Sequence, residues 1–276
     1  MLVINVFRTF SEQLSIEQDM KKRMNPQLRK KLILQILNEQ DFVAIQKVVD
    51  RCNVSEITIR RDLIELESEG MLVRTHGGAT KPENGNQLSS YDLKINKNRS
   101  RKEQICKLAA SYINNNDIIF IDCGTTLFYL TKYIKNLKFL IVITNSLPVV
   151  SELLDSPNIK LILVGGEVAV ERKAMYGPLA SKNIVQYHAN KAFIGADGVS
   201  LASGISSYDE KEASITLKMV DNADEVFLLC DSSKIERKSF FKFAPFSKID
   251  HFITNDDINP QYLKEYIDAG IHVVIE

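Results

Sequence analysis

Hydrophobic residues near the start of the chain recur at helical spacing, which predicts short amphipathic helices. After Pro26, which suits the first turn of a helix, Leu28, Leu32 and Ile36 follow one another at steps of four residues. A second helix is expected after a short extended pair of residues, although Ala44 before it is a weak N-cap. The apolar side of this second helix would consist of Ile45, Val48, Val49 and Cys52.

A third helix is expected directly after these two. Ser55 is a good N-cap, and an acid such as Glu56 is favourable in the first turn because it complements the helix dipole. This helix is expected to run to Glu69 and to end at Gly70. The next residues are MLVRTHGGAT, which predict a strand, a Gly-Gly turn and a return strand. Three helices followed by a β-hairpin predict a winged helix-turn-helix domain, mainly α with a β-wing.

The pattern changes in the second part of the chain, where short apolar runs alternate with longer helical segments. Runs of this length, rich in Ile, Val and Phe, are typical of strands buried on both faces of a mostly parallel sheet. Segments 102–114 and 209–223 are long enough for crossover helices, so we expect an α/β domain. The seven runs are DIIFID, KFLIVIT, IKLILVGG, KAFIGADG, EVFLLCDSS, HFITND and IHVVIE.

These patterns divide the 276 residues into two domains of unequal size, and a hydrophobic fraction of 45% is ample for two cores. The stretch KPENGNQLSS has the composition of a linker between them. The expected segments are an extension at 1–23, the winged helix-turn-helix at 24–80, a linker at 81–98 and the α/β domain at 99–276. The extension has neither the charge order of a signal peptide nor an apolar run long enough for a membrane anchor.

Composition restricts the classes of function. Basic and acidic residues number 35 each, so a nucleic-acid function must rest on local arrangement rather than on total charge. The four cysteines are far apart and include no CxxC pair, which indicates reduced, mostly buried thiols in a cytoplasmic protein rather than a zinc or disulfide framework. No pair of histidines or cysteines has metal-ligand spacing, so we expect no metal and no cofactor.

The third helix has its cations near the start and its acids towards the end. Thr58, Arg60 and Arg61 lie in the first two turns and project away from the apolar side. A DNA-reading helix presents this half to the major groove. The alternative is a solvated helix whose arginines pair with nearby acids. Two further features favour DNA binding over a solvated helix. The wing carries Arg74 and His76, and the segment KKRMNPQLRKK has six cations and no acid.

The segment from Gln27 to Ala79 resembles the DNA-binding domain of the DeoR family of bacterial transcriptional regulators. The resemblance rests on the long motif VSEITIRRDLIELESEGMLVRTHGGA. Two departures are Ala44 with Ile45, where the family tends to have a polar cap, and Ile57, which would either touch a thymine methyl group or pack. The resemblance implies DNA contacts by Ser55, Thr58, Arg60 and Arg61, with Arg74 and His76 in the wing.

Small and polar residues follow five of the apolar runs, where strands of a parallel sheet would end. The residues after DIIFID would suit a phosphate. Free backbone amides at a helix start, a glycine (Gly124) that allows the phosphate to approach closely, and the hydroxyls of Thr125 and Thr126 could all contact it. Ligands of open α/β sheets collect at this edge, so a common pocket is favoured over separate turns and caps. Further residues at these strand ends include Gly195 and Asp197. A dinucleotide site is disfavoured because no GxGxxG follows the first run.

From about Arg99 to Asn255 the ordered motifs resemble the DeoR-type sensor domain, related to ribose-5-phosphate isomerase and coenzyme A transferase folds. The resemblance implies that a phosphorylated sugar binds here and changes the affinity for operator DNA. Its phosphate would lie on the turn from Gly124 to Thr126, with Lys234 opposite. The implied effector residues are Asp122, Gly124, Thr125, Thr126, Asn145, Ser146, Gly165, Gly166, Asp231 and Lys234.

The competing class is a sugar-phosphate isomerase with an accessory domain. The segment GADGVSLASG keeps Asp197 but lacks the adjacent acid of such enzymes, and Asp209, Glu210 and Glu212 suit the exposed start of a helix. The scattered histidines offer no catalytic arrangement, and a pure scaffold would not require polar strand ends. We therefore expect a sugar-responsive transcriptional regulator, a repressor rather than an enzyme, that oligomerises to present two winged domains to operator half-sites. Dimer and tetramer both remain compatible with the sequence.

Overall fold

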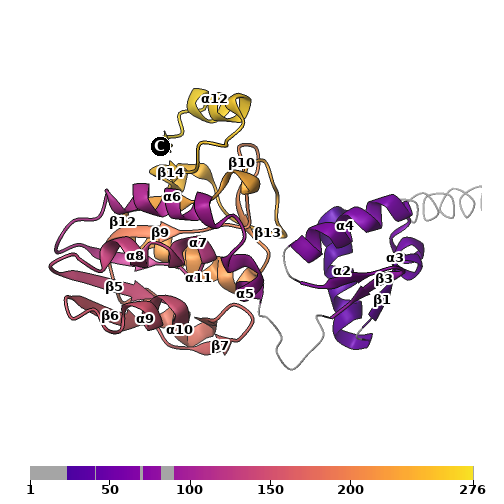
Figure 1. Cartoon of the computed structure of the whole chain (residues 1–276), viewed down its shortest axis with the longest axis horizontal. Coiled ribbons are helices and arrows are strands. Elements are labelled where there is room, and N and C mark those ends of the chain that lie inside the picture. Colours follow the sequence, from indigo (N-terminus) through magenta and orange to yellow (C-terminus); the bar gives the residue numbers. More distant parts are fainter. Residues whose placement is uncertain (1–23, 41, 69–70, 82–89, 276) are drawn as a thin grey trace, which may run out of the picture. The chain divides into compact units, whose positions relative to one another are not determined.

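The computed structural model describes residues 24–40, 42–68, 71–81 and 90–275. The chain forms two compact units, Met1–Gln87 and Leu88–Glu276, which we call the N-terminal and C-terminal units (Figure 1). The expected extension at 1–23 lies outside the described residues. No helix in the described ranges is long and apolar enough to cross a membrane.

The N-terminal unit has the expected order of helices and wing. Ile33, Ile36, Leu63 and Leu66 are among the fully buried side chains at its centre. The β-strands form an antiparallel sheet in the order β1-β3-β2, so the extended pair before the second helix joins the wing. The elements are α2 (Pro26–Gln40), β1 (Phe42–Ala44), α3 (Ile45–Cys52), α4 (Glu56–Ser68), β2 (Val73–Thr75) and β3 (Gly78–Thr80).

The turn between α3 and α4 follows from its sequence. Asn53 closes α3 in the left-handed conformation, with φ 50°, which asparagine tolerates better than most residues. The Ser55 hydroxyl then accepts a hydrogen bond from the backbone N–H of Thr58 at 3.3 Å, which confirms the predicted N-cap of α4. Ala44 makes no side-chain cap hydrogen bond, also as expected. The expected end of α4 at Glu69 and Gly70 lies outside the described residues.

A buried ion pair joins α2 to α4. The Arg29 guanidinium donates from Nε to Asp62 Oδ2 at 2.6 Å and from Nη2 to Asp62 Oδ1 at 2.9 Å. Its third nitrogen donates to the Met24 carbonyl at 2.7 Å. Arg29 is 6% exposed and Asp62 is 4% exposed, so both charges depend on each other rather than on water. This two-pronged contact fixes the orientation of α4 on α2.

The C-terminal unit is built on a seven-stranded parallel sheet in the order β15-β14-β12-β9-β4-β5-β6. Each of the seven predicted apolar runs supplies one strand, so the predicted α/β class and parallel sheet are confirmed. The strands are β4 (Ile118–Ile121), β5 (Leu140–Thr144), β6 (Ile159–Leu163), β9 (Ala189–Ile194), β12 (Ala223–Leu229), β14 (His251–Ile253) and β15 (Val273–Val274).

Both faces of this sheet are covered, which explains the continuous apolar runs. Along β4, Ile119 and Ile121 enter one core, and Phe120 between them enters the other. One core contains residues of α6 (Arg99–Ala110), α7 (Thr125–Phe128), α8 (Thr131–Ile134) and α9 (Leu147–Leu153). The other core contains residues of α10 (Gly177–Ile184), α11 (Glu210–Asp221) and α12 (Pro260–Asp268). The predicted crossover segments correspond to α6 and α11.

Smaller elements follow the strand ends and were not predicted from the sequence. An antiparallel sheet in the order β10-β11-β13 and a two-stranded β7-β8 hairpin lie outside the main sheet. All four cysteines are buried free thiols, as expected. The additional elements are β7 (Glu167–Ala169), β8 (Ala174–Tyr176), β10 (Gly198–Ser200), β11 (Gly204–Ser207), β13 (Phe241–Ala244), and the 3-10 turns η1 (Ser232–Lys234) and η2 (Phe246–Lys248).

The predicted linker at 81–98 is too long. Helix α5 (Ser90–Ile95) lies inside this range, and the C-terminal unit begins at Leu88. Tyr91 is 6% exposed, and its backbone N–H donates to the Glu171 carbonyl at 3.1 Å. A helix of 6 residues is too short to show periodicity, so the sequence did not reveal that α5 packs against the C-terminal unit.

We predict that Asp62→Asn lowers the unfolding free energy of α4 by about 3–5 kcal/mol, because the neutral amide leaves the buried Arg29 charge uncompensated. Hydrogen exchange of the α4 amides in the full chain measures this local unfolding. Glu65→Gln is the matched control, because the Glu65 side chain is 45% exposed in its ion pair with Lys30. That change should cost less than about 1 kcal/mol. Equal effects of the two substitutions would contradict a special role of the Arg29–Asp62 pair.

Candidate functional site

The start of α4 carries the predicted DNA-binding side chains on the outside of the N-terminal unit. Ser55, Arg60 and Arg61 are exposed and Thr58 is half-buried. The Arg60 guanidinium pairs with Glu56, one turn earlier, at 2.5 Å, and both side chains are 51% exposed. Arg61 makes no hydrogen bond or ion pair with another described residue. The Arg61 guanidinium can therefore bind another molecule without breaking an existing contact, whereas Arg60 would have to leave Glu56.

The acids in the second half of α4 are neutralised by cations from neighbouring elements. Asp62 pairs with Arg29, Glu65 pairs with Lys30 at 2.6 Å, and Glu67 pairs with Arg74. The negative total charge of α4 is thus compensated where the acids lie. The basic segment before and within α2 needs correction, because the buried charge of Arg29 serves the ion pair rather than a DNA surface. Residues 21–23 of that segment lie outside the described ranges.

The wing is braced against α4 through Arg74. Its Nε donates to Glu67 Oε2 at 2.6 Å, and its backbone N–H donates to Glu67 Oε1 at 3.0 Å. These hydrogen bonds lower the pKa of Glu67. His76 is exposed near the turn of the wing. Gly78 must lack a side chain because a Cβ there would collide with the Val43 carbonyl of β1.

Ile57 points outward from α4. Its side chain is 67% exposed, so it does not pack in the N-terminal unit. Of the two alternatives that the sequence left open, packing within this unit is excluded. An exposed Ile in the first turn of α4 is positioned to contact an apolar group such as a thymine methyl.

The carboxyl edge of the main sheet brings the predicted effector segments together. The five strands that precede them occupy adjacent positions in the order β12-β9-β4-β5-β6. Because these strands are parallel, their carboxyl ends lie at the same edge of the sheet. The residues after each strand therefore lie side by side, as the pocket prediction requires.

Three of the predicted effector residues use their side chains to accept hydrogen bonds from backbone N–H groups. The buried carboxylate of Asp122 accepts hydrogen bonds from the Thr216 hydroxyl at 2.9 Å and the Cys123 N–H at 2.7 Å, and burial raises its pKa. Ser146 caps α9 by accepting from the Val149 N–H at 3.4 Å. Asp231 caps η1 by accepting from the Ser233 N–H at 3.0 Å. These bonds explain the residue types without a ligand.

Two of the predicted glycines, Gly165 and Gly166, are required by the backbone. Gly165 and Gly166 have φ values of 74° and 117°, and a Cβ on Gly166 would collide with the Tyr176 carbonyl. Gly124 is the N-cap residue of α7, and a Cβ there would lie 3.0 Å from Leu127 Cδ2. The Gly-Gly pair therefore forms a tight turn between β6 and β7, whether or not a ligand is bound.

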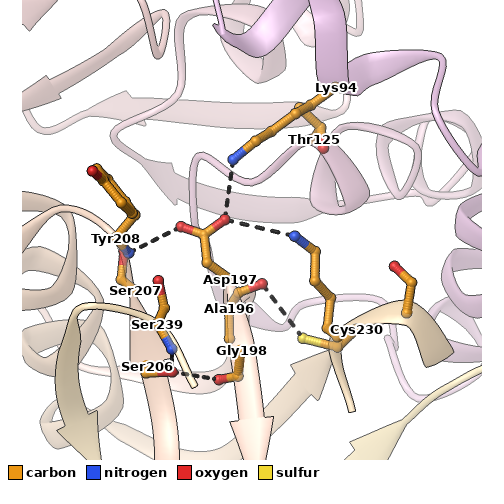
Figure 2. A network of polar contacts seen from close by, with 12 residues as sticks. Lys94, Thr125, Ala196, Asp197, Gly198, Ser206, Ser207, Tyr208, Cys230 and Ser239 are labelled. Carbon is orange, nitrogen blue, oxygen red and sulfur yellow. Dashed lines mark hydrogen bonds and ion pairs between the residues drawn. The ribbon is translucent and has the colours of Figure 1, made fainter. Parts of the chain in front are cut away.

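Asp197 is the centre of a charged cluster at this edge. Its Oδ1 lies 3.1 Å from Lys94 Nζ and 3.8 Å from Lys234 Nζ, and its Oδ2 lies 3.6 Å from Arg172 Nη2. Oδ2 also accepts a hydrogen bond from the Tyr208 backbone N–H at 3.1 Å (Figure 2). Burial by itself would raise the pKa of Asp197, but the three cations together hold it well below its usual range.

Glu212 joins the same cluster from α11. Its carboxylate forms an ion pair with Arg172, which also faces Asp197. Burial raises the pKa of Glu212 to about 7 despite the adjacent guanidinium. The expectation of an exposed helix start is correct for Glu210, whereas Asp209, which caps α11, is half-buried. It is wrong for Glu212, which is 9% exposed and turned into the cluster.

Lys102 connects the cluster to the predicted phosphate turn. Its Nζ donates to the Thr125 hydroxyl at 3.0 Å and to the Lys94 carbonyl at 2.6 Å. Burial lowers the pKa of Lys102 to about 8. Thr126 follows in the same turn, and its carbonyl accepts from the Cys106 thiol at 3.0 Å. A buried cation thus lies beside the hydroxyl that the sequence assigned to phosphate.

Asn145 and Tyr91 carry buried polar groups near this edge that have no hydrogen-bond partner among the described residues. Neither Nδ2 nor Oδ1 of the Asn145 side chain has one, and the Tyr91 hydroxyl is also unpaired. Both flank the segment before and within β8, because the Met175 N–H donates to the Asn145 carbonyl and the Tyr91 N–H donates to the Glu171 carbonyl. Buried polar groups are normally satisfied, so these two are suited to a hydrogen-bonding ligand.

Sequence reasoning missed four charged members of the cluster: Lys94, Lys102, Arg172 and Glu212. Lys94 and Lys102 flank the start of α6, and Arg172 lies in the β7-β8 turn, so none directly follows a strand of the main sheet. Asp197 was noted at its strand end but not included in the effector set.

A winged helix-turn-helix followed by an α/β unit with a charged cluster at its strand ends defines a two-part helix-turn-helix regulator. Family models agree with both parts. The DeoR-like helix-turn-helix domain matches residues 29–84, and the DeoR C-terminal sensor domain matches residues 97–256. The chain belongs to the DeoR family, which confirms the resemblance found in the sequence.

Curated relatives are similar over nearly their whole length. The lactose phosphotransferase system repressor of Lactococcus lactis subsp. lactis is 40% identical over 88% of this chain and 96% of its own. The L-fucose operon activator of Haemophilus influenzae is 31% identical over 87% of this chain and 96% of its own. Among solved structures, ribose 5-phosphate isomerase from Plasmodium falciparum aligns with 17% identity and a TM-score of 0.37, over 49% of this chain and 52% of that chain. That likeness is too weak to define the fold.

We predict that protonation of Glu212 stabilises the C-terminal unit at low pH. The pKa of Glu212 rises from 4.5 in the unfolded chain to about 7 in the folded one, so the folded state binds the proton more tightly. Its contribution, roughly 3 kcal/mol, is complete below pH 4.5 and is lost as the pH rises through about 7. In urea unfolding between pH 5 and pH 8, Glu212→Gln should remove this decline, whereas the exposed Glu210→Gln should retain it. Parallel pH profiles for wild type and Glu212→Gln would show that Glu212 titrates normally.

Proposed function

We propose that this protein is a DNA-binding transcriptional regulator of a sugar-utilisation operon, and that a phosphorylated sugar bound in the C-terminal unit modulates it. The observation that carries the proposal is a partly buried, cation-rich cluster at the strand ends of a chain whose N-terminal unit exposes Arg61 on a winged helix-turn-helix. Relatives named for lactose and fucose systems support sugar control. A protein that binds bacterial operator DNA works in the cytoplasm.

We favour repression, with release by the effector. The relative with the highest identity among those described above is named a repressor, and another is named an activator. A regulator with one winged unit per chain must present two copies to reach two half-sites. We therefore propose a homo-oligomer assembled through the C-terminal unit, either a dimer or a tetramer.

The isomerase alternative can be compared through the carboxylates of the cluster. Asp197 is a poor general base because its pKa lies well below the usual range. Glu212 has a pKa of about 7, which suits proton transfer, but Arg172 holds its carboxylate. We propose that the protein binds sugar phosphates without converting them. Turnover of ribose 5-phosphate, glucose 6-phosphate or fructose 6-phosphate would overturn this, and thermal stabilisation without turnover would support it.

Arg61→Ala is predicted to weaken binding to operator DNA by about 1–3 kcal/mol, because the substitution removes an uncommitted guanidinium from the start of α4. The measurement is a fluorescence-anisotropy titration of a duplex selected from a random pool by the wild-type protein. Lys264→Ala is the matched control, because it removes a cation that is 75% exposed on α12 of the C-terminal unit. Unchanged affinity for Arg61→Ala at matched salt would exclude Arg61 from the DNA interface.

Lys234→Ala is predicted to leave DNA affinity unchanged and to weaken effector binding at least tenfold, about 1.4 kcal/mol. Its ammonium is one of the cations around Asp197, and its removal lowers the attraction for a phosphate. Isothermal titration with the three sugar phosphates measures the change. Loss of DNA binding together with effector binding would instead indicate that Lys234 maintains the fold.

A further inference from the structure

Helix α5 connects the predicted effector site to the other unit in the sequence. It is the first described element of the C-terminal unit, and residues 82–89 link it to the wing strand β3. Its two inward side chains, Tyr91 and Lys94, reach the carboxyl edge of the sheet. A short helix between a DNA-binding unit and a ligand site is suited to respond to the ligand.

The end of α5 and the phosphate turn share one buried cation. Lys102 Nζ donates to the backbone carbonyls of Lys94 at 2.6 Å and Ile95 at 3.4 Å, and to the Thr125 hydroxyl at 3.0 Å. In addition, the Tyr129 hydroxyl donates to the Ile95 carbonyl at 3.0 Å. Any ligand that draws Lys102 or Thr125 towards itself therefore acts on the backbone of α5.

Three cations share one carboxylate beside Lys94. The side-chain nitrogens of Lys94, Arg172 and Lys234 lie 3.1, 3.6 and 3.8 Å from the Asp197 carboxylate. The Lys94 side chain is 14% exposed, and burial lowers its pKa. An anion placed among these three cations would be stabilised by them, and Figure 2 shows Lys94 directed at the shared carboxylate of Asp197.

The second side chain of α5 supplies a neutral polar group. The Tyr91 hydroxyl is buried and has no hydrogen-bond partner among the described residues, and the same holds for the Asn145 side-chain amide. The backbones of both residues hydrogen-bond to the segment from Glu171 to Met175. Phenol and amide together can donate and accept hydrogen bonds, which is the pattern that sugar hydroxyls satisfy. The ring of Tyr91 is held in place by Lys173 Nζ, 5.5 Å from its centroid.

We propose that α5 is part of the effector site, with Lys94 binding the anionic group of the ligand and Tyr91 a hydroxyl, and that α5 thereby transmits occupancy of the site to the DNA-binding unit. This inference rests on the proposed function and adds two binding residues and a route of regulation to it. When the ligand binds, the Lys94 ammonium turns partly from the Asp197 carboxylate to the anionic group of the ligand. The shift of α5 then acts on the segment that leads to the wing.

The test uses the full chain, with glucose 6-phosphate, fructose 6-phosphate, ribose 5-phosphate and inorganic phosphate as probes. Ligand affinity is measured by titration calorimetry, and affinity for the selected duplex is measured without ligand and at saturation. Lys94→Met should weaken the binding of an active sugar phosphate at least tenfold and reduce its effect on DNA affinity even at saturation. Lys94→Arg should restore part of both. Tyr91→Phe should weaken the sugar phosphate but leave inorganic phosphate unchanged, and Lys264→Met should match the wild type.

Each outcome decides a separate question. If the wild type responds to a sugar phosphate, and Lys94→Met binds it with the same affinity and shows the same change in DNA affinity, the role of α5 is overturned and the proposed function remains intact. Weaker ligand binding with a full DNA response at saturation would retain Lys94 as a binding residue and reject transmission through α5. A wild-type protein that binds none of the probes would overturn the proposed function and this inference together. Tyr91→Phe and Lys94→Arg preserve size, so they decide the question if Lys94→Met does not fold.

Discussion

The partly buried carboxylate of Asp197 is the constraint on which the candidate effector site depends. Lys94, Arg172 and Lys234 come from three separate segments, and their charges could not be held close together in a low-dielectric interior without an acid between them. Asp197 is itself placed by the end of β9, a central strand of the parallel sheet. The sheet thus fixes one negative charge, and the surrounding loops and helices supply cations to it.

Hydrophobic patterning was sufficient to predict the sheet, because strands buried on both faces are continuous apolar runs and each run became one strand. It was also sufficient for α4, where the Ser55 cap and the apolar positions agree. The charged cluster was only partly predictable. Asp197 follows a strand directly, whereas Lys94 and Arg172 reach the site from α5 and a hairpin turn, which depend on long-range packing. Several predicted site residues, such as Ser146 and Gly166, turned out to have structural reasons of their own.

The two halves of α4 have different tasks that its net charge conceals. Acids in the second half meet Arg29, Lys30 and Arg74, so their charge stabilises the unit rather than repelling DNA. The first half presents Arg61 and Ile57 to the outside. A count of charges along the helix would have argued against DNA binding, whereas the location of each partner argues for it.

The clamp between Arg29 and Asp62 has a further consequence for regulation. Because its two hydrogen bonds are direct and buried, the clamp holds α4 in one orientation on α2 within the N-terminal unit. In the proposed homo-oligomer, the effector would therefore alter the spacing and relative orientation of two intact N-terminal units rather than the internal arrangement of either one.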